Sequence, residues 1–121
     1  MNEGVTVGNA YTAGASYRSW IVGHFVGGPL HSTAVEVKWA RHAAGEERSE
    51  WSADAATTLV ILVRGRFRLL FPDREAMLRE EGDFVHWLPG IHHRWVAEEE
   101  SVVLTVRWPS LRPTGGADEL G

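Results

Sequence analysis

The chain has 121 residues, the size of one domain, and its 44% hydrophobic and 23% charged residues are typical of a globular protein with a buried core. A formal charge of −4 and a pI near 5.8 argue against general binding to nucleic acid or to an acidic membrane, because both reward clustered Lys and Arg. Cysteine is absent, which excludes disulfides and thiolate zinc sites. We therefore expect the partner to be a small molecule.

Residues 1–16 have neither the basic opening nor the apolar run of a signal peptide. No window contains the roughly 18 apolar residues that are needed to cross a bilayer. The sequence therefore predicts a cytoplasmic protein. Only Lys38 among the twelve basic residues is lysine, a bias that indicates a GC-rich bacterial genome.

Along the chain, residues 1–18 are rich in Gly, Ala, Ser and Thr and predict a loose arm, or an edge strand ordered only by docking. Short β-forming runs separated by turn residues then predict a sandwich or barrel over residues 19–108. The predicted strands are 20–26, 32–39, 57–63, 66–71, 84–87, 93–97 and 101–108. Helix signals are poor, with at most one turn within 73–81. Residues 109–121 predict a disordered tail.

The segment 63–66, Val-Arg-Gly-Arg, predicts a two-residue hairpin turn in which Gly65 takes positive φ. The period of two then places one apolar set inward, namely Thr58, Val60, Leu62, Phe67, Leu69 and Phe71. The opposite face of the first strand carries Leu59, Ile61 and Val63 and also needs cover, from the N-terminal arm or from a second copy. We therefore expect a homodimer.

Two strands carry charged residues within apolar patterns. Glu36 and Lys38 alternate with Val35, Val37 and Trp39, which predicts that the two charges face solvent. In the last strand Arg107 shares a face with Val103 and Thr105. Arg107 is thus either a surface residue or a clamp for a carboxylate or phosphate near the barrel end.

The segment 82–95, GDFVHWLPGIHHRW, resembles the second motif of the cupin family: glycine, five residues, proline, one, glycine, two, histidine. Gly82, Gly90 and His93 fall on that spacing, whereas Leu88 stands at the proline position and Pro89 follows it. The motif implies a strand, a tight turn and a second strand that returns one imidazole to the barrel interior. Adjacent strand residues face opposite ways, and the motif selects His93 rather than its neighbour.

The first cupin motif reads glycine, five residues, His-x-His, four residues, Glu, six residues, glycine, and Gly45 and Gly65 match its end glycines. In that register Trp51 and Ala53 stand at the metal-binding histidines, and Thr58 stands at the glutamate. The resemblance implies an all-β cupin double-stranded β-helix, a jelly-roll barrel, across most of residues 20–108. That fold hosts dioxygenases, isomerases, epimerases, sugar-binding and storage proteins.

A first-row metal needs three or four converging ligands, so three missing ligand positions predict a site without metal or other cofactor. An alternative metal site recruits displaced histidines, namely His24, His31, His42 and His86. The predicted pocket centres on His93 as donor, acceptor or proton shuttle, with Trp51 and Trp95 either stacking on a ring or filling the space of a metal. The predicted ligand-lining residues are Trp51, Ala53, Thr58, Leu62, Phe67, His93, Trp95 and Arg107.

Three functions follow from this site. The first is a metal-free cupin that binds an apolar or aromatic small molecule, as a carrier, sensor or protective protein. The second is a metal-free isomerase, cyclase or epimerase with His93 as general acid or base and Thr58 nearby. The third is a metal-dependent oxygenase or isomerase with displaced ligands. The sequence contains no nucleophile elbow and no phosphate-binding glycine loop.

Overall fold

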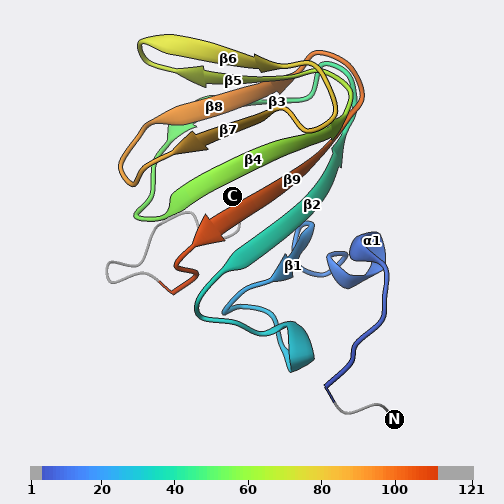
Figure 1. The fold of residues 1–121 in the computed structure, drawn as a ribbon. Helices are drawn as coiled ribbons and strands as arrows, with labels where there is room; N and C mark the ends of the chain where they lie inside the picture. Colours follow the sequence, from blue (N-terminus) through green and yellow to red (C-terminus); the bar gives the residue numbers. More distant parts are fainter. Residues whose placement is uncertain (1–3, 112–121) are drawn as a thin grey trace.

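The computed structural model describes residues 4–111, and within them the protein is nearly all β, with two antiparallel sheets that enclose a common interior (Figure 1). One sheet has the strand order β1-β2-β9-β4-β7 and the other has the order β3-β8-β5-β6. The elements are α1 (Ala10–Ala13), β1 (Trp20–Val22), η1 (Gly28–Leu30), β2 (Glu36–His42), β3 (Glu47–Ser52), β4 (Thr57–Arg64), β5 (Phe67–Phe71), β6 (Arg74–Leu78), β7 (Phe84–Trp87), β8 (His93–Ala97) and β9 (Ser101–Trp108). The predicted all-β jelly-roll class is confirmed.

The core lies between the sheets and follows the period of two in β4 and β5. Val60 and Leu62 from β4 pack with Phe67 and Leu69 from β5, and each is at most 5% exposed. The inward face predicted from the sequence is therefore correct. Burial on this scale is the main stabilising term of a small β domain.

Gly65 connects the two sheets rather than closing a hairpin. β4 pairs with β7 and β9, whereas β5 pairs with β6 and β8, so the predicted β4–β5 hairpin is wrong. Gly65 has a φ of 103°, and a Cβ there would collide with the carbonyl oxygen of Glu100 and with Ser101. The backbone N–H of Arg66 donates to the Ser101 hydroxyl at 3.1 Å and fixes the crossing.

Two polar strands were not expected. The one turn of helix predicted within 73–81 is wrong, because β6 pairs with β5 along its whole length. The guanidinium of Arg68 on β5 joins Glu75 on β6 to Glu98 beyond β8, so ion pairs add to the backbone pairing of this hairpin. β3, with the sequence ERSEWS, is an edge strand with mostly exposed side chains, and it shows no hydrophobic alternation to reveal it.

Both ends of the described chain contact the barrel. The ring of Tyr11 in α1 packs edge-on against Trp39, with ring centroids 6.4 Å apart, so the predicted arm covers part of β2 rather than β4. Ser110 lies beyond the predicted barrel boundary at 108 yet is fully buried. The rest of the predicted tail, 112–121, lies outside the described residues. Within residues 4–111 no helix has the length and hydropathy to cross a membrane.

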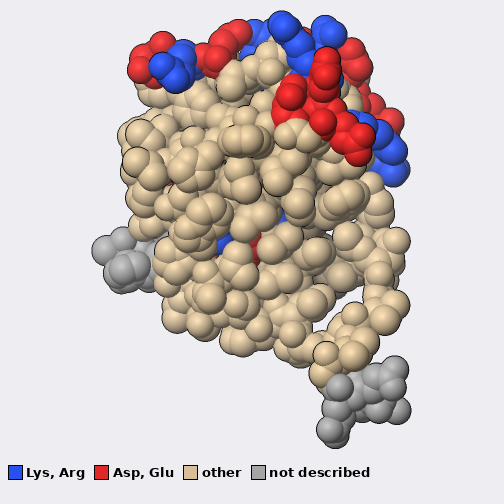
Figure 2. Space-filling model, viewed as in Figure 1, with Lys and Arg blue, Asp and Glu red and all other residues tan. Residues whose placement is uncertain are grey.

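The outer face of the five-stranded sheet is apolar around β4. Ile61 pairs with Leu104 on one side and with Phe84 on the other, and Phe84 is 65% exposed. Figure 2 shows charged side chains gathered around β5, β6 and the loops beside them, while the surface over β4, β9 and β2 is almost without them. Exposed apolar surface of this kind is typical of a contact between protein copies.

We expect a homodimer that buries this outer face, and the Phe84→Glu variant tests it. A carboxylate in the contact would lose hydration without gaining a partner, so the variant should be the 13.4 kDa monomer by light scattering. Trp51→Glu, which changes an exposed indole on the other sheet, is the control and should remain dimeric. A 13.4 kDa mass for the unmodified protein at micromolar concentration would refute the expectation.

Candidate functional site

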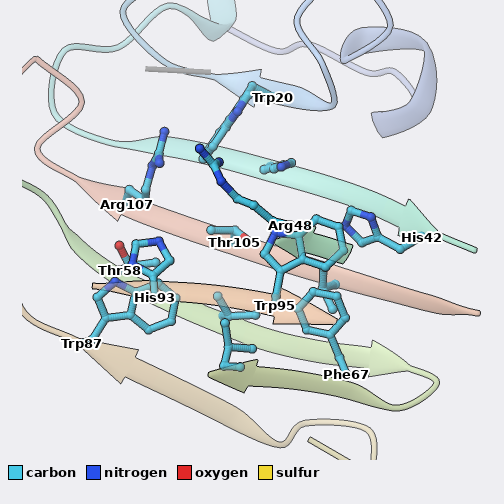
Figure 3. A pocket seen from close by; sticks show the side chains of 14 residues that line it. Trp20, His42, Arg48, Thr58, Phe67, Trp87, His93, Trp95, Thr105 and Arg107 are labelled. Carbon is cyan, nitrogen blue, oxygen red and sulfur yellow. The ribbon is translucent and has the colours of Figure 1, made fainter. Parts of the chain in front are cut away.

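The candidate site is a cavity of about 50 Å³ between the two sheets (Figure 3). Its aromatic wall consists of Trp20, Phe67, Trp87 and Trp95. Its polar wall consists of Lys38, His42, Arg48, Thr58, His93, Thr105 and Arg107. The volume accommodates roughly four water molecules and is well below the ~300 Å³ of a drug-sized pocket. Only a very small ligand fits without movement of side chains.

His93 is the first residue of β8, and its ring enters the cavity from there (Figure 3). Its Nδ1 lies 3.0 Å from the carbonyl oxygen of Ile91, and because a carbonyl only accepts, Nδ1 carries the proton. Nε2 is then an acceptor, with the Ser52 hydroxyl 3.4 Å away. Burial lowers the pKa of His93, so the ring is neutral at neutral pH. It lies against Trp87, with ring centroids 4.5 Å apart.

Arg107 is buried in the cavity wall and holds the site to three parts of the chain. Its Nε donates to Glu36 on β2 at 2.6 Å, and its Nη1 donates to Asp54 after β3 at 3.2 Å. The second carboxylate oxygen of Glu36 accepts the Ser110 hydroxyl at 2.9 Å. The guanidinium also lies 4.3 Å from the ring centroid of Trp20, within cation–π range.

The prediction that Glu36 and Lys38 face solvent is wrong. Glu36 is fully buried, opposite Arg107 in the β2–β9 register, and Lys38 lines the cavity with its Nζ 5.4 Å from the Trp20 ring centroid. The apolar partners of the alternation, Val37 and Trp39, occupy the outer face of β2. A buried carboxylate is tolerated here because Arg107 compensates its charge across the strand pair. The predicted surface placement of Arg107 is therefore wrong, because its guanidinium is buried and binds the carboxylates of Glu36 and Asp54.

Thr58 is only 2% exposed, and its Oγ1 has no hydrogen-bond partner within the described structure. Figure 3 shows this hydroxyl beside the His93 ring, at the edge of the cavity. A buried hydroxyl without a partner costs about 1–3 kcal/mol, so such groups are rare unless a ligand or water completes them. Thr58 therefore marks the point in the cavity where a polar ligand atom is expected.

Five of the eight predicted ligand-lining residues meet in this cavity: Thr58, Phe67, His93, Trp95 and Arg107. The other three lie elsewhere. Trp51 is 45% exposed, with its ring 4.9 Å from the Arg94 guanidinium. An irregular register between Arg48 and Ser52 in the β3–β8 pair changes which side chains of β3 face inward. Ala53 follows β3 outside the wall, and Leu62 is buried in the apolar core.

The sequence did not predict four further wall residues of chemical interest. Trp20, Trp87 and Arg48 were unassigned, and His42 was considered only as a displaced metal ligand. The ring centroid of His42 lies 4.3 Å from that of Trp95, and the Nδ1 of His42 is 2.9 Å from the carboxylate of Glu46. Burial lowers the pKa of His42, although Glu46 opposes the shift. For Trp87 one sequence signal was available, because the alternation of β7 puts it on the inner face with Val85.

A larger groove of about 580 Å³ lies on the surface beside β6 and β7. It shares only Trp87 with the cavity and is lined largely by exposed residues such as Leu88 and Ile91. The polar side chains that line this groove are exposed, whereas Thr58 and Arg107 of the cavity are buried. We therefore take the smaller, interior space as the functional site.

The residues at the four cupin ligand positions do not fit a metal ion. Trp51 and Ala53 offer no ligand atom, the Thr58 hydroxyl is a weak one, and only His93 provides a good donor. The remaining histidines do not converge on it, since His42 is held by Glu46 and the exposed His86 stacks on Trp108. Among residues 4–111 no group of three or more His, Cys, Asp or Glu is placed to hold a metal.

Comparison with known proteins supports the fold. No protein-family profile and no curated protein sequence matches the chain. Solved structures do match: a Cupin 2 conserved barrel domain protein from Salinispora arenicola has 23% identity over 69% of this chain and 71% of its own, with a TM-score of 0.58. A cupin superfamily protein from Desulfitobacterium hafniense has 21% identity over 64% and 69%, at 0.59. KdgF from Halomonas sp. has 18% identity over 65% and 73%, at 0.59.

The Arg107–Glu36 pair generates a stability prediction. Glu36→Gln removes the charge that compensates Arg107, so we expect about 3 kcal/mol of destabilisation in urea unfolding. Glu50→Gln, at an exposed position of β3, is the matched control and should change stability by less than about 0.5 kcal/mol. Equal unfolding midpoints for the two variants would show that the buried pair is dispensable.

The lowered pKa of His93 generates a pH prediction. The unfolded chain binds protons at the ordinary histidine pKa of about 6.5, whereas folded His93 resists protonation. Stability should therefore be full above that value and fall as the pH drops through the lowered folded pKa; His42 acts in the same direction. Melting temperatures measured from about pH 8 to about pH 5 should fall less steeply for His93→Gln than for His92→Gln. Parallel curves would contradict the assignment.

Proposed function

We propose that this chain, which has the cupin fold, binds a small organic molecule in the cavity beside His93 and holds it without a metal ion. The observation that carries the proposal is the Thr58 hydroxyl, which is buried and unpartnered at the edge of that cavity. Its position corresponds to the cupin metal-binding glutamate. The barrel thus has a polar, ligand-directed group where the motif would have a metal ligand.

The wall supplies both parts of a binding site. The rings of Trp20, Trp87 and Trp95 provide apolar contact area, and they are held by neighbours rather than free to rotate. His93 presents Nε2 as an acceptor, and Thr58 provides a hydroxyl that can donate or accept. A few fixed polar groups in an otherwise aromatic cavity favour specific binding of a small molecule.

The structure limits the position and the size of a ligand more than the sequence-based interpretation does. A ligand ring cannot stack on Trp51 and Trp95 together in this arrangement, because Trp51 lies outside the cavity. The volume of about 50 Å³ also limits a ligand to a few heavy atoms unless a side chain such as Arg48 moves. A carrier, a sensor and a protective binding protein all remain consistent with this site. So does an enzyme in which His93 Nε2 accepts a proton from the ligand.

Binding of a fragment panel to neighbouring histidine variants tests the proposal. At least one compound should raise the melting temperature and change the fluorescence of the cavity tryptophans, and its affinity should fall at least about tenfold in His93→Gln. His92→Gln is the matched control, because His92 is exposed and adjacent, and it should bind as the unmodified protein does. Mass spectrometry of the same mixtures separates a carrier from an enzyme.

The proposal is wrong if no compound of the panel shifts the melting temperature or the fluorescence. It is also wrong if the two histidine variants bind with equal affinity, because binding would then lie outside the cavity.

A further inference from the structure

We infer that the edge strand β3 is the gate of this cavity: the segment between Glu46 and Asp54 lifts away from β8 and admits the ligand. The inference rests on the proposed function and names the route by which that site is filled. Three features carry it: the enclosure of the cavity, the weak attachment of β3 and the firm attachment of both its ends.

The cavity is closed to a ligand in the described arrangement. Thr58, which marks the expected position of a polar ligand atom, is 2% exposed, and Trp20 on the facing wall is 1% exposed. The space between them is about 50 Å³. A molecule that reaches Thr58 from solvent must therefore displace part of the wall.

β3 is the part of the wall with the least apolar anchoring. Every other strand within residues 4–111 contributes at least one apolar side chain that is at most 7% exposed, whereas β3 contributes none. Its one large apolar side chain, Trp51, is 45% exposed. Because apolar burial is the main term that opposes local opening, β3 should separate from the barrel at a lower free energy than the other strands.

β3 is also held to the barrel by a single irregular strand pair. It lies at the edge of the four-stranded sheet and pairs only with β8 among the described strands. Arg48 stands opposite Trp95, but the register then shifts, and the next matched pair is Ser52 with His93. A shift of this kind interrupts the hydrogen-bond ladder, so fewer backbone bonds oppose opening.

Two side chains of β3 reach toward the interior, and both make polar contacts. Figure 3 shows Arg48 extending from β3 toward Trp20, and the Ser52 hydroxyl lies 3.4 Å from His93 Nε2. Water can replace such contacts when the strand lifts, whereas it cannot replace buried apolar contacts. Lifting β3 thus removes one wall of the cavity and uncovers the His93 acceptor in a single movement.

Both ends of this segment are tied to the barrel, so it moves as a strap. Before β3, the Gly45 N–H donates to the Ala97 carbonyl at 2.7 Å, and the Ala97 N–H donates to the Glu46 carbonyl at 2.8 Å. After β3, the Asp54 carboxylate accepts from Arg107 Nη1 at 3.2 Å. These fixed points return the strand to its place after a ligand has passed.

A disulfide between β3 and β8 tests the gate, in the variant Glu47→Cys with Val96→Cys. The chain has no cysteine of its own, and these two residues stand opposite each other. The readout is hydrogen exchange of the Trp20 indole N–H in D₂O, followed by NMR, because this ring is buried in the cavity wall. Oxidation should slow this exchange at least about tenfold relative to the same protein with the disulfide reduced.

Leu70→Cys with Glu75→Cys is the matched control, because it links an opposite apolar and acidic pair in β5 and β6, away from β3. Its oxidation should leave the Trp20 exchange unchanged. The backbone amide of Val103, which is buried in the central strand β9, reports global unfolding in each protein. It should exchange more slowly than the Trp20 indole.

A pair of serine variants tests the gate without a cross-link. Ser52→Ala removes the contact with His93 and should speed the Trp20 exchange about two- to tenfold. Ser49→Ala, at an exposed position of the same strand, is the control and should exchange as the unmodified protein does.

The gate is refuted if the Trp20 indole exchanges no faster than the Val103 amide, because the cavity would then open only by global unfolding. Equal slowing by the two disulfides, or equal exchange in the two serine variants, also overturns it. These measurements need no ligand, so such results leave the fragment-binding test of the proposed function intact. Failure of the fragment panel overturns the proposed function instead, and with it the role of β3 as a ligand gate, whatever the exchange rates.

Discussion

The buried ion pair between Arg107 and Glu36 is the interaction on which the site depends. It joins β9 to β2 at the point where Glu36 and Arg107 stand opposite each other. Through Asp54 and Ser110 it also fixes the segment after β3 and the chain beyond β9. Two charges at this depth are stable only because each has several partners. The position of Trp20 against the guanidinium follows from the same pair, and with it one wall of the cavity.

This pair also brings side chains from separate parts of the chain together in the barrel interior. A metal ion in a barrel interior draws side chains from several strands to one point. Here Arg107 does so with Glu36 and Asp54, while three positions that correspond to ligands in the cupin motifs hold an outward indole, an alanine and a hydroxyl directed to the cavity. The described interior of the barrel thus holds a charged side-chain network beside a small cavity.

The sequence predicted features that depend on local geometry. The inward set of β4 and β5 and the entry of His93 were correct because strand alternation and turn spacing are local properties. Trp51 was misplaced because the irregular register of β3 arises from its pairing with β8, which no local pattern records. Glu36 was misplaced because an isolated carboxylate is normally exposed, and its compensating partner lies 71 positions away. The predicted β4–β5 hairpin was wrong for the same reason, because the pairing partners of each strand are set by distant segments.

The position of β9 in its sheet has a consequence for how the chain acquires its structure during synthesis. β9 lies between β2 and β4 and pairs with both, although it is the last strand of the described residues 4–111. Until the ribosome has released it, β2 and β4 have no common partner, and the backbone N–H and C=O groups along those edges remain unpaired. The five-stranded sheet, and with it the cavity, can therefore form only after nearly the whole barrel has been translated. A nascent chain of this kind depends on chaperones, or on rapid completion, to avoid association through those edges.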